Sequence, residues 1–250
     1  MTTSLLLTGA SSGLGAGLAR AYARPGATLH LSGRDVARLE AVASSCRSQG
    51  AEVFATPLDV TDGDAMADWV AESERRRPLE LVIANAGISA GTHGGGESVA
   101  QVRAIFAVNV DGVVNTVMPA LAPMRGRGQG RVALMSSLAG FRGFPGAPAY
   151  CASKAAVRVW GEALRGELAA EGVSVSVICP GFIRTPMTAV NRFKMPFLME
   201  VDTAAAIIRR GLERGRDRIA FPWPLHVAAR LAGCLPSALM DRLAENMPRK

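Results

Sequence analysis

Tyr150 and Lys154 stand four residues apart, and Ser137 lies thirteen positions before Tyr150. If residues 150 to 170 form a helix, this spacing places the phenol and the ammonium on one helix face, within side-chain reach. A nearby cation stabilises a phenolate, and roughly 3 to 4 kcal/mol of such stabilisation lowers a tyrosine pKa by about 2 to 3 units. The three side chains are therefore candidates for proton transfer at a carbonyl, although a Tyr/Lys pair at this spacing also arises by chance.

Lysine is rare in this chain, which makes Lys154 informative. The sequence contains 28 basic residues, and only Lys154, Lys194 and Lys250 among them are lysines. Arginine supplies the rest of the positive charge, so a lysine beside Tyr150 is a distinctive choice.

Length and composition favour a single soluble α/β domain over residues 1–250. Apolar residues make up 49% of the 250 residues and charged residues 20%. We expect a cytoplasmic protein, because the start of the chain lacks the features of a secretory signal and no apolar run is long enough to span a membrane. The cysteines are scattered without metal-ligand spacing, which indicates reduced thiols and no metal site. They are Cys46, Cys151, Cys179 and Cys234.

The net charge of +7 raises the question of an anionic partner. The arginines are dispersed and aromatic residues are only 5% of the chain, so nucleic-acid binding is not expected. A solvated basic surface and a site for a phosphate-bearing cofactor account for the charge.

Short apolar segments alternate with longer helical patterns along most of the chain. This alternation predicts a doubly wound, seven-stranded parallel sheet of the Rossmann-like kind, with helices on both faces. The expected strands are Ser4 to Thr8, Thr28 to Ser32, Glu52 to Pro57, Leu79 to Ala84, Arg131 to Ser136, Val173 to Cys179 and Arg218 to Ala220. The expected helices are Gly13 to Arg24, Asp35 to Gln49, Asp62 to Arg76, Ser98 to Met124, Tyr150 to Glu171 and Asp202 to Arg214. Thr61 and Asp64 form a plausible capping box for the third helix.

Two C-terminal segments have no clear place in the sheet. Residues 187–200 are rich in methionine, phenylalanine and proline without a clear period, and they form a candidate substrate lid of loop or short helices. Residues 222–250 form a tail with two short helical patterns broken at Pro236. We expect this tail to pack on the domain or on another subunit, and contact with a membrane surface is the less favoured alternative.

A glycine string follows the first expected strand and opens the first helix. Glycine is needed where backbone amides approach a pyrophosphate and where a helix sits close on a strand. The string reads Gly9, Ala10, Ser11, Ser12, Gly13, Leu14, Gly15, and its placement at a strand-to-helix turn predicts a dinucleotide site.

The residues at the end of the second expected strand indicate whether the protein prefers NAD or NADP. Arg34 offers a planar fork for the 2′-phosphate of NADP, whereas an acidic residue there would accept the ribose hydroxyls of NAD. Asp35 could serve as that acceptor, but we interpret it as the N-cap of the next helix. The sequence therefore favours NADP, with NAD as the alternative.

With these motifs in order, the chain resembles the short-chain dehydrogenase/reductase family in its single-domain form, from Ser4 to about Met187. Other matching motifs are Asp59 and Val60 after the third strand, Asn85, Ala86 and Gly87 after the fourth, Asn109 in the long helix, and Pro180 and Gly181 after the sixth. The C-terminal segment lacks the glycine-rich closing strand by which the ketoacyl reductases of this family build a tetramer. The resemblance therefore does not imply that this chain forms the usual tetramer. We still expect a homodimer or another homo-oligomer.

The resemblance implies a role for each matching residue. Tyr150 would act as general acid or base, Ser137 would bind the substrate oxygen, and Asn109 would hold a water that links Lys154 to solvent. Lys154 would bind the nicotinamide ribose and lower the pKa of Tyr150. The residues implied in cofactor binding are Gly9, Ser11, Ser12, Gly13, Leu14, Gly15, Arg34, Asp59, Val60, Asn85, Ala86, Gly87, Tyr150, Lys154, Pro180, Gly181, Ile183 and Thr185.

The implied function is an NADP-dependent oxidoreductase that interconverts a small-molecule carbonyl compound and its secondary alcohol. One alternative is a nucleotide-sensing or scaffold protein that keeps the fold without turnover. Another is a membrane-surface reductase of lipophilic carbonyls. The substrate cannot be read from the sequence.

Overall fold

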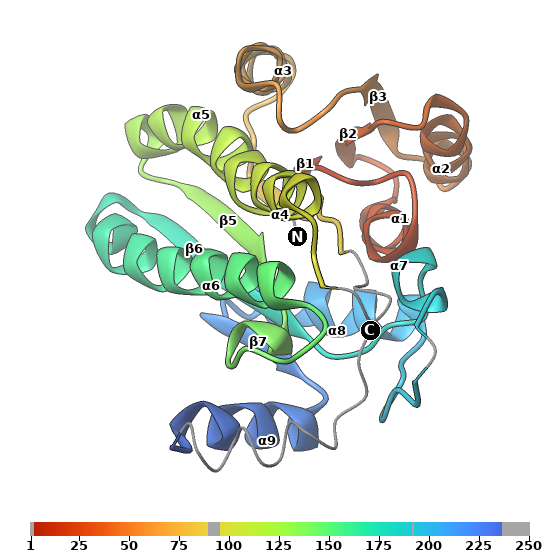
Figure 1. Cartoon of the computed structure of the whole chain (residues 1–250). Helices are drawn as coiled ribbons and strands as arrows, with labels where there is room; N and C mark the ends of the chain where they lie inside the picture. The colour runs from red at the N-terminus through yellow and green to blue at the C-terminus, as the bar shows by residue number, and fades with distance from the viewer. Residues whose placement is uncertain (1–2, 90–95, 192, 237–250) are drawn as a thin grey trace.

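The computed structural model describes residues 3–89, 96–191 and 193–236. Within them seven strands form one sheet, every pair parallel, in the order β3-β2-β1-β4-β5-β6-β7 (Figure 1). The strands are β1 Ser4–Leu7, β2 Thr28–Gly33, β3 Glu52–Pro57, β4 Leu81–Ala84, β5 Gly130–Met135, β6 Val173–Pro180 and β7 Arg218–Phe221. The predicted α/β class and seven-stranded parallel sheet are confirmed.

Helices cover both faces of this sheet. The buried residues of α1 (Gly13–Tyr22), α2 (Val36–Ser48) and α8 (Val201–Glu213) join one apolar cluster. Those of α3 (Gly63–Arg76), α5 (Gly112–Arg127) and α6 (Pro148–Leu168) join a second cluster on the opposite face. The other helical elements are α4 Val99–Phe106, the π-helix η1 Ala107–Asp111, the 3₁₀ turns η2 Leu138–Gly140 and η3 Ala169–Glu171, α7 Pro186–Ala189 and α9 Trp223–Cys234.

The order of the strands sets where a ligand can bind. The chain moves outward from β1 through β2 to β3, and then returns so that β4 pairs with the other side of β1. The loops after β1 and β4 therefore diverge at the carboxyl ends of these strands. In sheets of this kind, ligands bind in the crevice outside such a switch point.

The start of α3 differs from the prediction. The N-cap is Asp62, whose side chain accepts the N–H of Ala65, so the proposed capping box of Thr61 with Asp64 is wrong. The Thr61 N–H and hydroxyl both bond to Oδ1 of Asp59. Because this local turn engages Thr61, the next short acceptor, Asp62, begins the helix.

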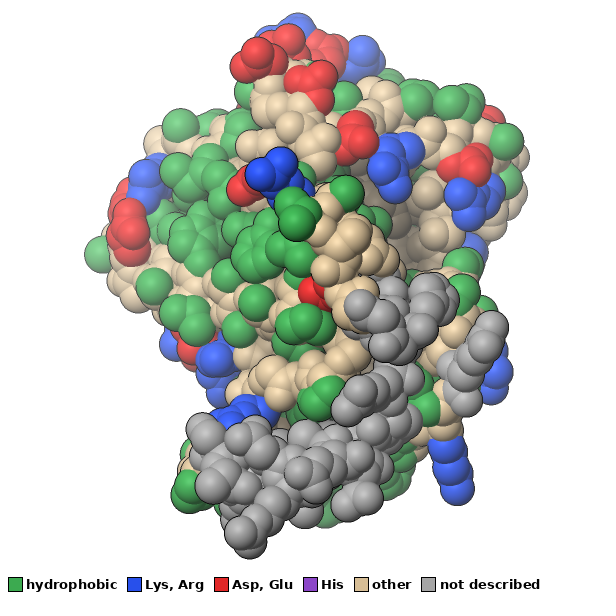
Figure 2. Space-filling model, in the orientation of Figure 1, with side chains coloured by type: hydrophobic (Ala, Val, Ile, Leu, Met, Phe, Trp, Pro, Cys, Tyr) green, Lys and Arg blue, Asp and Glu red, His purple; other side chains and the backbone are tan. Residues whose placement is uncertain are grey.

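The predicted helix from Ser98 to Met124 is divided into three parts. Ser98 and Gln101 form a reciprocal capping box at the start of α4, and the π-helix η1 interrupts the path before α5 begins. By length and composition, the stretch Val99–Arg127 could cross a membrane, and 44% of its most apolar window is buried. Packing of Val117 and Leu121 in the core accounts for part of this apolar character. On the outer side, apolar side chains gather over α5 and α6 (Figure 2).

The C-terminal elements lie beside the last strands of the sheet. Leu225 and Ala229 of α9 pack against a small buried cluster that includes Leu138. The second helical pattern expected after Pro236 lies outside the described residues. The candidate lid is tied at its base by backbone hydrogen bonds between the two sides, from the Arg184 N–H to the Met199 carbonyl and from the Met199 N–H to the Phe182 carbonyl.

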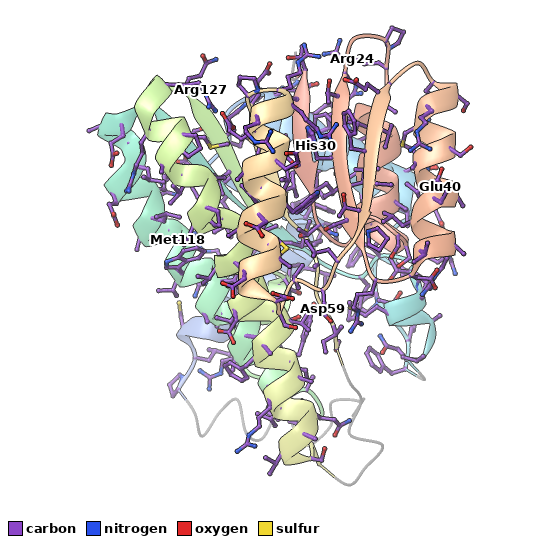
Figure 3. All side chains as sticks on the ribbon, turned by 90° about the horizontal axis from the view of Figure 1, so that it is seen from above. Arg24, His30, Glu40, Asp59, Met118 and Arg127 are labelled. Atoms are coloured by element: carbon purple, nitrogen blue, oxygen red, sulfur yellow. The ribbon has the colours of Figure 1, made fainter. Side chains whose placement is uncertain are left out.

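His30 is a titratable group placed inside the sheet layer. It is 1% exposed and stacks on Phe54 of the neighbouring strand at 5.3 Å, and its Nε2 has no hydrogen-bond partner among the described residues. Figure 3 shows His30 among the strands, between Arg24 at one end of the sheet and Asp59 at the other. Burial, aided by the charge of Arg76, lowers the pKa of His30 to about 4.

Because the folded protein favours neutral His30, this group stabilises the fold fully above the unfolded pKa of about 6.5. That contribution, at most about 3 kcal/mol, is lost as the pH falls from 6.5 to 4. We expect His30→Phe to retain the stacking and to show a shallower loss of unfolding free energy over this range than the wild type. Denaturant unfolding at pH 7, 5.5 and 4 measures the difference, and parallel curves for the two proteins would contradict it.

Candidate active site

The turn between β1 and α1 brings backbone amides close to the end of the sheet. Gly9 and Gly13 have positive φ angles of 68° and 52°. A Cβ on Gly15 would lie 2.0 Å from the carbonyl oxygen of Gly9, so only glycine permits this approach. The N-terminus of α1 and the amides of this turn form a suitable site for a pyrophosphate.

The loop after β4 is bound to the same turn. The Oγ1 of Thr8 accepts the N–H groups of Asn85 and Ala86 at 3.1 and 3.2 Å. The Asn85 amide donates to the carbonyls of Thr8 and Gly9 at 2.9 and 3.3 Å. These bonds hold the two diverging loops in fixed positions on both sides of the switch point.

A cavity of about 560 Å³ opens along these loops, a size that suits a small-molecule ligand. All the cofactor-binding residues predicted from the sequence line this cavity, together with Ser137. The cavity is also lined by residues that the sequence did not assign to cofactor binding, namely Gly33, Asp35, Arg38, Leu58, Ile88, Val108, Met135, Ser136, Pro186, Met187 and Thr188.

Two arginines lie at the end of the cavity that follows β2. The side chain of Arg34 is 66% exposed and lies 3.6 Å from Asp59, a distance at which a surface ion pair is weak. Hydrogen bonds from Thr61, together with Arg34, hold the pKa of Asp59 below its usual value.

Asp35 is the N-cap of α2, as predicted, and one of its oxygens accepts the N–H of Arg38. Its other oxygen accepts Nε of Arg38 at 2.7 Å. Arg38 therefore reduces the capacity of Asp35 to accept ribose hydroxyls and adds a second cation to the cavity wall. The sequence signal for the bond between Arg38 and Asp35 was their spacing, because Arg38 lies three residues after the capping aspartate.

Lys154 is buried at the opposite end of the cavity. It is 3% exposed, and its Nζ donates to the carbonyl of Met135 at the end of β5 at 2.9 Å. Burial lowers the pKa of Lys154 to about 8. The hydrogen bond to Met135 therefore holds this ammonium in place. Because of its burial, the ammonium also loses its proton more easily than the ammonium of an exposed lysine does.

Tyr150 differs from the prediction in one respect. Burial raises its pKa, and a side-chain hydrogen bond with Ser137 opposes that rise only in part. The sequence predicted that Lys154 would lower this pKa, but the ammonium lies 5.8 Å from the ring centre and donates to Met135. The loss of hydration of a phenolate therefore has the larger effect, and Tyr150 stays protonated at neutral pH.

Asn109 lies in the π-helix η1 behind these residues. Its Oδ1 accepts the N–H of Ile88, and its Nδ2 donates to the carbonyl of Ile88 and to Oγ of Ser153, all within 3.0 Å. It is fully buried and does not line the cavity. Its side chain joins the loop after β4 to α6, while the predicted water-holding role stays a prediction.

A second chamber, of about 590 Å³, adjoins the first. The residues that line both spaces are Ser137, Tyr150, Gly181, Met187 and Thr188. The hydroxyls of Ser137 and Tyr150 therefore stand where one ligand in the long cavity could meet another in the chamber. This is the geometry that proton transfer during a reaction between two bound molecules requires.

Comparisons with known proteins agree with this arrangement. Residues 3–195 match the family model described as short chain dehydrogenase. An uncharacterised oxidoreductase from Myxococcus xanthus is 41% identical, over 97% of this chain and 96% of its own length. A short-chain dehydrogenase from Sphingobium yanoikuyae, solved with NADPH, is 28% identical over 98% of this chain and 96% of its own, with a TM-score of 0.81.

A family member from Burkholderia phymatum, solved with NAD, has a TM-score of 0.84 over the whole of this chain and 97% of its own. At 23% identity, it supports the fold alone. The order of the strands, the glycine turn and the family match together show that this chain belongs to the short-chain dehydrogenase/reductase family of oxidoreductases.

Proposed function

We propose that the protein uses NADP to interconvert a carbonyl compound and its secondary alcohol, with Tyr150 as general acid and base. The observation that carries this proposal is the long cavity, which runs from Arg34 and Arg38 to Lys154 and Tyr150. Its two ends suit the two ends of a dinucleotide: cations for a phosphate, and a proton donor where chemistry would occur.

When bound, NADPH supplies the hydride, and the chain supplies positioning and the proton. Ser137 donates a hydrogen bond to the carbonyl oxygen of the substrate. As negative charge develops on that oxygen, Tyr150 transfers its phenolic proton to it. The raised pKa of Tyr150 suits this direction, because the proton is present at neutral pH. Alcohol oxidation requires the phenolate, so it should become faster as the pH rises.

Lys154 and Asn109 act through position. The ammonium of Lys154 faces the cavity beside Tyr150 and would donate to the hydroxyls of the nicotinamide ribose. Asn109 fixes Ser153 on α6, next to Lys154 in the chain, and fixes Ile88 on the opposite wall. A non-catalytic nucleotide sensor would be expected to lack one of the four side chains proposed for catalysis. All four are present in this chain, so that alternative finds no support.

The fold accommodates either cofactor, because the Sphingobium relative was solved with NADPH and the Burkholderia one with NAD. Arg34 and Arg38 favour NADP, because a guanidinium binds a 2′-phosphate through charge-assisted hydrogen bonds. A homo-oligomer also stays a proposal, supported by the exposed side chains of Phe106, Met118 and Val159.

We expect Tyr150→Phe to lower kcat for carbonyl reduction about 10²-fold to 10⁴-fold, because it removes the proton donor and retains the ring. The dissociation constant of NADPH should change less than about threefold, since the phenol adds little to cofactor binding. Reduction assays over a panel of carbonyl compounds and fluorescence titration of NADPH measure the two quantities.

Tyr22→Phe is the matched control, because Tyr22 is the other tyrosine of the chain and its buried hydroxyl has no partner among the described residues. Its kcat should equal that of the wild type. Undiminished turnover by Tyr150→Phe would remove Tyr150 from the mechanism.

The cofactor preference can be tested with Arg34→Ala and Arg38→Ala. Each should raise KM for NADPH by about tenfold or more, because a charge-assisted hydrogen bond contributes roughly 1.5 to 3 kcal/mol. KM for NADH should change little in Arg34→Ala and should fall, if it changes, in Arg38→Ala, because the loss of Arg38 frees Asp35 to accept ribose hydroxyls. Arg47→Ala is the control, since Arg47 lies on the same helix, α2, and does not line the cavity. Equal effects of the two cavity variants on both cofactors would contradict the assignment to NADP.

A further inference from the structure

The chamber beside Tyr150 is built from several separate parts of the chain. The loop after η2 contributes Phe144, and the start of α6 contributes Tyr150 and Cys151. The candidate lid contributes Phe193, which packs edge to face on Phe182 at 5.9 Å. A further wall is one face of α9. This space is distinct from the long cavity, although the catalytic hydroxyls lie at their junction.

The chamber walls are mainly apolar. Among the described residues, no carboxylate lines the chamber. The Thr188 hydroxyl bonds to backbone groups of Ile183 and Thr185, and the Asn191 amide donates to the sulfur of Met195 at 3.4 Å. The one lysine on the wall, Lys194, is exposed. A charged group deep in this space would lose its hydration without a buried partner, whereas an apolar group would gain from burial.

The face of α9 determines how much room the chamber offers. Leu225, Ala228, Ala229 and Ala232 line it, and their spacing of three and four places them on one side of the helix. A Cβ on Gly181 would lie 3.3 Å from Leu225, so this end of α9 packs directly on the wall shared by the two spaces. Leu231 is 62% exposed and does not line the chamber. Three of the four residues that α9 presents to the chamber are alanines, which leave its volume open.

We propose that the chamber binds an uncharged apolar substituent of the carbonyl substrate, and that the alanine face of α9 sets the length limit of that substituent. The substrate class is then ketones, or the corresponding secondary alcohols, with one long or bulky apolar group. The inference rests on the proposed function, because it places the carbonyl at Ser137 and Tyr150. A small ketone would leave most of the 590 Å³ unused by substrate.

The test is calorimetric binding of the methyl ketones from 2-butanone to 2-decanone to the full chain with saturating NADP⁺, which cannot reduce them. Affinity should rise about fourfold for each added methylene until the chamber is filled. An affinity that stays flat across the series would overturn the proposal.

Ala228→Phe and Ala232→Phe should each weaken 2-decanone binding about tenfold or more, and change 2-butanone binding less than about twofold, because they fill the far part of the chamber. Leu231→Phe, an apolar-to-aromatic change on the outer face of the same helix, should bind both ketones as the wild type does. Thermal unfolding of all three variants verifies that the protein still folds. Wild-type binding of 2-decanone by both folded alanine variants would contradict the role of this face.

Reduction of the same ketones with NADPH separates this inference from the proposed function. Turnover of every ketone with the same kcat/KM would support the function and overturn the inference. A binding gradient without NADPH oxidation by any ketone would contradict the proposed function, while the chamber would stand as an apolar ligand site. Turnover that rises with chain length, and falls for long ketones alone in the alanine variants, supports both.

Discussion

The arrangement of the active site depends on a buried ammonium at the end of β5. Lys154 donates to the carbonyl of Met135, while its own carbonyl accepts the hydroxyl of Ser136 at 2.7 Å. A Cβ on Gly140 would lie 2.7 Å from that same carbonyl, so the loop after β5 lies against α6 with no space for a side chain. Two hydrogen bonds and one close backbone approach therefore fix α6 on the sheet at the turn that carries the proposed catalytic residues, Tyr150 and Lys154.

The properties of Lys154 and Tyr150 follow from this position. Removing an ammonium from water disfavours its charged form, which is why burial lowers the pKa of Lys154 to about 8. The same environment raises the pKa of Tyr150. A lysine suits this site in a chain that otherwise uses arginine, because its ammonium is compact and its pKa can shift, whereas a guanidinium stays charged. The low polarity that alters both groups also strengthens the hydrogen bonds that a carbonyl oxygen would receive.

The sequence predicted much of the fold and the cofactor cavity, because these features have local signals. Alternating strands and helices indicate the sheet, and glycines such as Gly15 are required where backbone atoms approach each other. The second cation, Arg38, was missed because its spacing from Asp35 indicates the local hydrogen bond and does not show that its side chain lines the cavity. The direction of the pKa shift of Tyr150 was also predicted wrongly. The spacing of the residues shows that Lys154 is near Tyr150. It does not show the burial of Tyr150, which has the larger effect on the pKa of the phenol.

The chamber was beyond prediction for a similar reason. Its walls bring Phe144, Phe193 and Ala228 together from parts of the chain that share no pattern of spacing. The tail could be expected to pack somewhere, but the side that α9 presents to Tyr150 depends on its contacts with η2 and β7. The chamber is therefore a tertiary feature, whereas the cavity predicted to bind the cofactor is encoded in short motifs.

The most direct test of this account is the ionisation of Lys154 itself. The chain has three lysines, so NMR of protein labelled at the lysine side chains would give three resonances, and Lys154→Met would assign one of them. We predict that this resonance titrates near pH 8, well below the ordinary lysine value of about 10.4. Titration of the Lys154 resonance at that ordinary value would contradict the buried ammonium on which the site depends.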